Sequence, residues 1–452
     1  MITNNTTNWH FLHRQLFLYA VIGTLLALIL TAATANAQQK VITLNEAIQL
    51  GVANSKDLKL SGAKIEQAVE QYNQAKDEAL PTGSASFGFN RAQIPANRLE
   101  FGEESLSLPK SANAYLGILS LNQVIFAGNK LKYARQSTEL LTQVSRLDET
   151  RDRTQIVYNI INSYYNLYKV LQGIKVVNQN VATLDQQIKQ SQRFFDQGIV
   201  TKNDVLQFQL QKANVQLNGI DLENNRRIVN YNLNIVLGLP ETTQLQIEQV
   251  TEADKPLGLL ASYIDTALTD RAELKQADLQ AQVADKNISS IKANTLPNLS
   301  AAASAYYVDV SANPLPKSGN FITPISLGLT ASWNFGALWT NKHKVAEAKI
   351  ERTQADISKS ITTDRIKNEV NQNYQNYLAA LDKIKLLQTA IAQAGENNKI
   401  LESKYRSNIA SAVERADSQT LLYQAQINLE LAKADAGLAY YTLLKSTGQL
   451  NY

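Results

Sequence analysis

Few residues of this 452-residue chain are of the types that catalyse reactions or hold metal ions. Cysteine is absent, which excludes a disulfide framework, a thiolate metal site and a cysteine nucleophile. Two of the three histidines, His10 and His13, lie in an N-terminal leader, so the rest of the chain keeps only His343. The sequence also has no glycine-rich phosphate loop. It therefore predicts a protein that is not an enzyme, with no catalytic residues, no cofactor and no metal.

The most suggestive pair of ionisable side chains is acidic. Glu414 and Asp417 are three residues apart, so both carboxylates would share one face of a helix. Like charges gathered around an opening favour cations and raise some of the carboxyl pKa values. Acids near a helix start also complement the helix dipole, which is a common arrangement on protein surfaces. Whether these acids surround an opening or only stabilise a helix start depends on where the helices place them.

Residues 1–37 are predicted to be a secretory signal peptide. Arg14 supplies its positive end, an apolar run extends from Leu16 to Leu30, and Ala35-Asn36-Ala37 provides an A-x-A end. An uncleaved anchor is the alternative, but the run is short for a span of about 20 residues. The leader contains one arginine and no acid, so its removal lowers the formal net charge from +4 to +3. Such a small charge argues for no nucleic-acid partner.

The remaining sequence consists of two similar halves. Short matches recur first at a spacing of 216 residues and later at a spacing of 210 residues. A constant offset over about 75 residues indicates a duplicated structural unit. The matches include Asp57-Leu58-Lys59 with Glu273-Leu274-Lys275, Leu80-Pro81 with Leu296-Pro297, Tyr164 with Tyr374, and Gly238 with Gly448.

Each half changes its hydrophobic period twice. Helical spacing holds over about 44–79 and 263–294, and Pro81 and Pro297 end these helices. Apolar and polar residues then alternate with the period of a strand, most clearly from Ile325 to Asn334. The predicted strands are about 82–91 and 114–126 in the first half and about 299–310 and 324–335 in the second, with loops at about 92–113 and 311–323.

After Gly128 and Gly336 the helical period returns with the 3-4 spacing of a coiled coil. Residues 130–197 would form a helix of roughly 100 Å, at 1.5 Å per residue. The return path is divided into two shorter helices, with residues 241–262 as a mixed connector midway along the rod. The sequence thus predicts one long helix beside two shorter ones, twice per chain.

The predicted strands indicate an oligomer. Segments of about ten alternating residues suit a transmembrane β-barrel, and Trp333 and Trp339 lie where an interfacial aromatic belt would form. Four strands cannot close a barrel, and lipid does not tolerate open sheet edges. Barrels begin at about eight strands, so two copies would give eight strands and three copies twelve.

The order of helix, Leu-Pro, strand, loop, strand, Phe-x-Gly and long helix resembles the TolC family of outer-membrane efflux proteins. The similarity covers about residues 44–449 and rests on Leu80-Pro81, Leu296-Pro297, Phe126-Ala127-Gly128 and Phe335-Gly336. Pro81, Gly128, Pro297 and Gly336 would be the structural junctions. The resemblance implies a mainly α fold with a membrane β-barrel, built from repeats at 38–240 and 263–452. Three chains would share a twelve-stranded barrel and form a helical tunnel in the periplasm.

The resemblance also implies a function. The protein would be the outer-membrane exit duct of a tripartite efflux or type I secretion system. It would conduct cargo passively from an inner-membrane pump of the RND or ABC type and a periplasmic adaptor. A secreted structural coiled coil or adhesin is the alternative, which would explain the helices but not the strands. The sequence does not indicate the cargo, the pump, or whether the system performs efflux or protein secretion.

Two turns between the long helices are the predicted adaptor contacts by the same resemblance. They are Gly198-Ile199-Val200-Thr201 and Asn408-Ile409-Ala410-Ser411. Gly or Asn after a helix also supplies a left-handed C-cap, whatever binds there. An exposed Ile199 or Ile409 would suit packing of a helix into a groove.

The entrance gate is predicted beside these turns. Glu414 and Asp417 match positions where family members narrow the closed entrance with carboxylate rings, and Asp204 and Tyr405 match positions that link neighbouring coiled coils. Where family members place an arginine in this latch, the chain has Ala410. The latch implied by the resemblance is a bond from a tyrosine hydroxyl to a carboxylate, although Asp204 would equally suit the first turn of a helix as an ordinary acid. Without the arginine, the latch would be weaker, or rebuilt through Lys202, Arg406 or Arg415.

Overall fold

The computed structural model describes residues 39–93, 95, 98–107, 110–248, 257–312, 323–450 and 452. The predicted signal peptide lies outside the described residues, as do residues 249–256 of the connector and most of the second loop.

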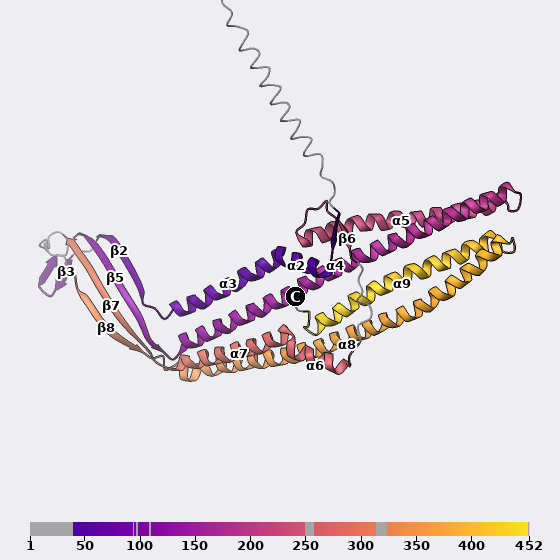
Figure 1. Ribbon diagram of the computed structural model, residues 1–452. Helices are drawn as coiled ribbons and strands as arrows, with labels where there is room; N and C mark the ends of the chain where they lie inside the picture. The colour runs from indigo at the N-terminus through magenta and orange to yellow at the C-terminus, as the bar shows by residue number, and fades with distance from the viewer. Residues whose placement is uncertain are drawn as a thin grey trace, which may run out of the picture.

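The molecule is elongated, with a β-sheet at one end and two helical hairpin turns at the other (Figure 1). The longest helix of the first half, α4, packs against α3, α5 and α7, and its counterpart α8 packs against α7 and α9. Along the described residues, no helix is both long enough and apolar enough to cross a membrane. The helices are α2 (Leu44–Asn54), α3 (Lys56–Asp77), α4 (Lys130–Asp196), α5 (Lys202–Leu237), α6 (Leu260–Asp270), α7 (Ala272–Lys292), α8 (Ala337–Arg406) and α9 (Ala412–Ser446).

The helices predicted over about 44–79 and 263–294 are helical in the structure, but each range is divided into two helices by one break. Ser55 (φ −60°, ψ 119°) separates α2 from α3, and Arg271 (φ −61°, ψ 124°) separates α6 from α7. The breaks lie 216 residues apart, at the spacing of the first matches. The Ser55 hydroxyl caps α3 by accepting from the Leu58 amide at 3.2 Å. The buried Arg271 guanidinium instead holds Glu273 and the Ser446 carbonyl.

A four-stranded antiparallel sheet in the order β2-β5-β7-β8 combines both halves. Its central pair, β5 with β7, joins one half to the other, whereas β2 and β8 form the two edges. The strands are β2 (Thr82–Gln93), β5 (Ser111–Ala127), β7 (Asn298–Ala312) and β8 (Ile325–Ser332). The segment predicted as the first loop, about 92–113, is not entirely a loop in the structure. It contains a hairpin of β3 (Arg98–Phe101) and β4 (Glu104–Ser107), which turns at Gly102 (φ 65°).

Directly paired residues point to the same side of a sheet, and in the rows nearer the helices this register gives one apolar and one polar face. One row on the apolar face consists of Ala85, Leu119, Ala305 and Ile325. The adjacent row on the opposite face consists of four serines, Ser84, Ser120, Ser304 and Ser326. In the rows farther from the helices, the side that carries the serines also carries Leu116, Ile118 and Val308. A sheet of this kind suits lipid on one side and water on the other.

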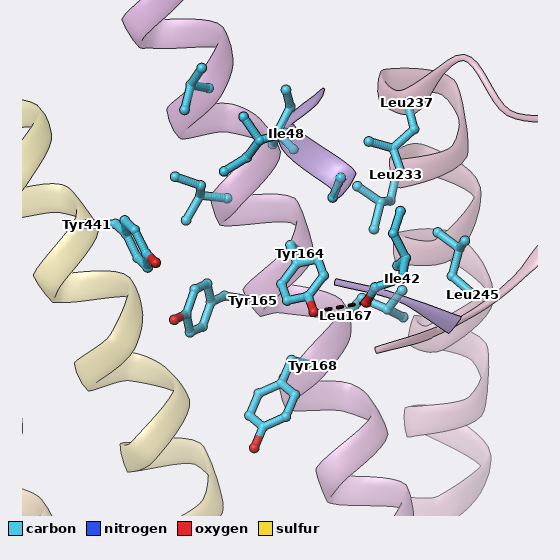
Figure 2. Close-up of a cluster of buried hydrophobic side chains, with 14 of the residues drawn as sticks. Ile42, Ile48, Tyr164, Tyr165, Leu167, Tyr168, Leu233, Leu237, Leu245 and Tyr441 are labelled. Carbon is cyan, nitrogen blue, oxygen red and sulfur yellow. Dashed lines mark hydrogen bonds between the residues drawn. The ribbon is translucent and has the colours of Figure 1, made fainter. Parts of the chain in front are cut away.

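The main hydrophobic core lies midway along the helices and is called here the equatorial core (Figure 2). Tyr164 and Tyr165 of α4 are fully buried in it, and Tyr441 of α9 faces Tyr165. The Tyr164 hydroxyl donates to the Ile42 carbonyl at 3.1 Å. Ile42 belongs to β1 (Gln39–Ile42), which pairs in parallel with β6 (Gln244–Ile247) of the connector. The equatorial core therefore ties the connector, α4 and α9 together.

Candidate functional site

The two predicted turns lie at the end of the helices farthest from the sheet and have the same backbone geometry (Figure 1). Gly198 (φ 72°) and Asn408 (φ 57°) are both left-handed. In each turn, the backbone amide of the next residue donates a hydrogen bond to a carbonyl of the preceding helix. Ile199 donates to Phe194 at 2.9 Å, and Ile409 donates to Lys404 at 2.8 Å. Both turns are thus left-handed C-caps, as the presence of Gly and Asn indicates.

The turns present different side chains to solvent. Ile409 is 75% exposed and Ile199 is 44% exposed. Ala410 is buried, whereas Val200 is half-buried. The apolar side chain available to a partner is therefore more prominent on the second turn than on the first.

Asp204 and Glu414 occupy equivalent places in two capping boxes. Asp204 Oδ2 accepts from the Thr201 amide at 2.7 Å and from its hydroxyl at 2.8 Å. Glu414 Oε2 accepts from the Ser411 amide at 2.8 Å and from its hydroxyl at 2.9 Å. The backbone amide of Ser411, followed by its hydroxyl, holds the pKa of Glu414 below its usual value. Both carboxylates therefore stabilise the first turn of a helix, whatever else they do.

Asp417 differs from the other two acids. It lies one turn beyond Glu414 in α9, its side chain is exposed, and it makes no ion pair or hydrogen bond within the described chain. Of the three predicted gate acids, it alone has a carboxylate that no described residue binds.

Tyr405 is buried rather than directed at a neighbouring carboxylate. Its ring packs against Phe194 and Phe208, with centroid separations of 6.0 Å and 5.7 Å. Burial raises the pKa of Tyr405, the nearby Ser191 hydroxyl opposes this rise, and the charge of Asp204 adds to it. Asp204 is thus close enough to act on Tyr405 electrostatically, but its carboxylate is bound to Thr201 and not to the Tyr405 hydroxyl. The predicted latch bond is absent within the chain in this conformation.

The candidate cations for a rebuilt latch do not reach Asp204 either. Arg406 forms an ion pair with Glu402, one turn earlier in α8. Arg415 is buried, where its guanidinium bonds Asn398 and lies 3.6 Å from Glu402. Burial lowers the pKa of Arg415, and the charge of Glu402 raises it. Lys202 makes no ion pair in the part of the chain that the structure describes.

Above the turns, buried amides and hydroxyls replace apolar side chains between α4, α5 and α9, and sequence reasoning missed them. Gln419 Nε2 donates to Asn180 Oδ1 at 2.8 Å, and Gln187 Nε2 donates to Gln419 Oε1 at 3.3 Å. We call this group the polar seam, consisting of Asn180, Gln187, Ser191, Gln211 and Gln419. Within the described residues, four of its buried atoms have no well-formed hydrogen bond, namely Asn180 Nδ2, Gln187 Oε1, Ser191 Oγ and Gln211 Oε1.

The sequence did contain a signal for the seam. The 3-4 spacing of the apolar stripe on α4 continues through Val177, Asn180, Leu184, Gln187 and Ser191. Polar residues at such inward positions reduce stability and can specify register. A buried group without a partner costs about 1–3 kcal/mol, so the seam is a weakly stabilised part of the helical body.

Comparison with known proteins identifies the family. A family model described as "Outer membrane efflux protein" matches residues 47–239 and 263–449. The chain belongs to this family. The resemblance drawn from the Leu-Pro and Phe-x-Gly junctions is thereby confirmed.

Among relatives of this efflux family member, the probable efflux pump outer membrane protein TtgC of Pseudomonas putida is 23% identical over 90% of this chain and 85% of its own. The outer membrane protein TolC of Escherichia coli is 22% identical over 87% and 80% of the two chains. The crystal structure of the outer membrane protein VceC from Vibrio cholerae superposes with a TM-score of 0.74 at 15% identity, covering 90% of this chain and 96% of that one. The predicted fold class is confirmed, and the secreted coiled-coil alternative is not supported.

Proposed function

We propose that this outer membrane efflux protein is an exit duct that crosses the outer membrane and extends through the periplasm. One observation carries the proposal, namely a sheet whose part nearer the helices has one apolar and one polar face, joined directly to helices such as α4, with 67 residues. At 1.5 Å per residue, α4 spans roughly 100 Å. A duct needs both parts, because the sheet lines a passage through lipid and the helices extend that passage towards the inner membrane.

The duct is a homotrimer in this proposal. The edges β2 and β8 each have a single partner in the sheet, and lipid does not tolerate open edges. Three copies would close a barrel of twelve strands by pairing β8 of one chain with β2 of the next. The exposed apolar side chains of α5 support the same conclusion, because their 3-4 spacing fits coiled-coil packing against another copy. They are Leu206, Leu210, Leu217, Ile220, Ile228, Tyr231 and Ile235.

The partners at the far end are a periplasmic adaptor and an inner-membrane pump of the RND or ABC type. The exposed Ile409 and Ile199 at the turns are suited to a helical partner that packs apolar side chains into grooves. The Pseudomonas putida relative is a probable efflux pump outer membrane protein. Energy comes from the pump in this scheme, and the chain itself is not an enzyme but a passive conductor of cargo.

The entrance gate is proposed at Asp204, Tyr405, Glu414 and Asp417. Asp417 is the strongest of the four, because its carboxylate is exposed and unengaged. Asp204 and Glu414 contribute charge and hold the helix starts, and Tyr405 anchors the end of α8 through its aromatic contacts. The entrance opens in this proposal when the α8–α9 hairpin separates from the α4–α5 hairpin along the polar seam.

The proposed function is tested by the mass of the protein extracted from outer membranes and by its conductance in a planar bilayer. We expect a trimer with a small conductance that increases in the variant Asp204→Ala, Glu414→Ala, Asp417→Ala. A matched control replaces three exposed acids far from the turns, Glu66→Ala, Asp221→Ala and Asp364→Ala, and should leave the conductance unchanged. A soluble monomer without conductance would contradict the duct, whereas a trimer unaffected by the first variant would contradict only the gate.

A further inference from the structure

Two groups of aromatic side chains bound the apolar face of the sheet. Phe87, Phe89 and Tyr115 cluster between the middle of the sheet and its end far from the helices, with Phe89 and Tyr115 ring centroids 5.0 Å apart. At the helical end, Trp333, Phe335 and Trp339 form a second cluster with centroid separations of 6.3 Å and 6.1 Å. All three rings of the second cluster are more than half exposed.

The separation of the two clusters matches a bilayer. About ten residues lie between them along the strands, which at about 3.4 Å per residue and a tilt of about 40° gives roughly 26 Å. The apolar band of an outer-membrane barrel is about 25 Å tall and is flanked by aromatic girdles. The second cluster therefore marks the membrane boundary on the helical side.

Immediately beyond this boundary, the described helices carry cations without ion-pair partners. The first two turns of α4 and α8 contain no acid, and no acidic residue occurs before Glu139 in α4 or before Glu347 in α8. We define the cationic collar as Lys130, Lys132 and Arg135 of α4, Lys292 of α7, and Lys342 and Lys344 of α8. All are exposed or half-exposed, and none of the six forms an ion pair within the described residues.

Lys130 and Lys132 in the first turn of α4 oppose the usual preference of helices, whereas Lys292 lies in the last turn of α7, where a cation is favourable. The start of a helix carries a partial positive charge and is stabilised by acids, whereas nearby cations are unfavourable. At the opposite end of the molecule, α5 and α9 follow this preference with Asp204 and Glu414 in their first turns. The first turns of α4 and α8 contain no acid. Lys130 and Lys132 thus carry a small electrostatic cost at the start of α4, which a bound anion would reduce.

We propose that the cationic collar binds the phosphate groups of anionic phospholipids in the membrane leaflet that faces the helices. The aromatic cluster would fix the depth of the barrel, and the lysines and arginine would reach the headgroup layer just below it. Asp77 and Glu78 at the end of α3 are the acids nearest in sequence to the sheet boundary, beside Lys76, and they are too few to neutralise the collar. The inference rests on the proposed function, because it needs the sheet to lie in the membrane.

The test compares lipid retained by the purified trimer from mixed micelles of phosphatidylglycerol and phosphatidylcholine. We expect the wild-type trimer to be enriched in phosphatidylglycerol at low salt and to lose this preference at about 1 M salt, where charges are screened within about 3 Å. The variant Lys130→Gln, Lys132→Gln, Lys342→Gln, Lys344→Gln should reduce the enrichment at least about tenfold, since each lysine near an anionic surface contributes about fivefold.

The control variant Lys59→Gln, Lys64→Gln, Lys367→Gln, Lys383→Gln removes the same charge from exposed positions distant from the sheet and should keep the enrichment. Equal loss in both variants, or no loss in the collar variant, would overturn the proposal. If the collar variant with four substitutions does not form trimers, the variant Lys342→Gln, Lys344→Gln should show a smaller loss of phosphatidylglycerol enrichment. The mass of the trimer and its fractionation with outer membranes, measured on the same preparations, test the proposed duct function separately from lipid binding.

Discussion

The equatorial core and the polar seam are two stretches of the same long helix with opposite character. At the equator, α4 contributes Tyr164, Tyr165 and Leu167 to a core closed by Tyr441 of α9 (Figure 2). Nearer the turns, the same face contributes Asn180 and Gln187, which share hydrogen bonds with Gln419 of α9. The difference teaches that a single helical stripe can pack tightly through apolar side chains at one level and weakly through polar side chains at another. Four predictions test this contrast.

The largest effect is expected from truncation in the equatorial core. Tyr165→Ala should lower the free energy of unfolding by about 3–5 kcal/mol, because a large fully buried ring leaves a cavity. Urea unfolding of the detergent-solubilised trimer measures the change. Leu259→Ala, at a side chain that is 79% exposed, is the control and should cost little. A loss below about 1 kcal/mol at Tyr165 would show that the core is not tightly packed.

The equatorial core is packed so closely that adding a single methyl group should also lower the free energy of unfolding. A Cβ on Gly437 of α9 would lie 2.5 Å from Tyr165 Cε1, so Gly437→Ala should destabilise the protein by about 1–3 kcal/mol. In the background of Tyr165→Val the same substitution should cost almost nothing. A double-mutant cycle without coupling would contradict the close contact.

In the polar seam, unlike in the equatorial core, substitution should stabilise the protein when apolar side chains replace the buried polar ones. Asn180→Leu, Gln187→Leu and Gln419→Leu together remove two of the four unpaired buried atoms, Asn180 Nδ2 and Gln187 Oε1, and should raise the free energy of unfolding by about 1–3 kcal/mol. They should also hold the entrance closed more often in single-channel records. Gln419→Leu alone is the matched contrast and should destabilise the protein, because Asn180 and Gln187 lose their shared partner. A destabilised triple variant would contradict the view of the seam as a weak contact.

The smallest effects are expected at the helix starts beside the turns. Ser411→Ala should cost about 1 kcal/mol, as for other N-caps, and Thr201→Ala should behave alike in the first turn. The pKa of Glu414 is lower in the folded chain than its usual value of 4.5. The Glu414 carboxylate therefore contributes fully to the stability of the folded state above pH 4.5, and this contribution is lost as the pH falls through the pKa of the folded chain. Glu414→Gln should remove this part of the acid sensitivity in unfolding curves. An unchanged pH profile would show that the capping box contributes nothing.

Much of the fold followed from local patterns in the sequence. The Leu-Pro and Phe-x-Gly junctions indicated where helices give way to strands, and Gly198 and Asn408 indicated the turns. The breaks at Ser55 and Arg271 could not be predicted from hydrophobic spacing, because neither residue is a helix breaker and Arg271 acts through distant partners. The pairing of β1 with β6 joins residues about 200 positions apart, which no local pattern encodes.

The candidate site was harder to predict than the fold. The positions of Asp204 and Glu414 at helix starts follow from the S/T-x-x-D/E pattern, but the burial of Tyr405 and Arg415 depends on packing between helices from both halves. The seam was missed because the search along α4 considered apolar residues only. Asn180 and Gln187 continue that spacing with polar side chains, so a search for interrupted stripes would have found them.

The central claim is that the helical hairpins separate along the seam while the equator stays closed. Because the chain has no cysteine, a pair introduced as Gln187→Cys and Gln419→Cys can be joined selectively by a bifunctional thiol reagent that contains a reducible disulfide. In the background of Asp204→Ala, Glu414→Ala and Asp417→Ala, single-channel conductance is recorded before and after reduction of this cross-link. We predict a small conductance when the cross-link is closed and a large one after reduction. A large conductance that persists with the cross-link closed would contradict separation along the seam.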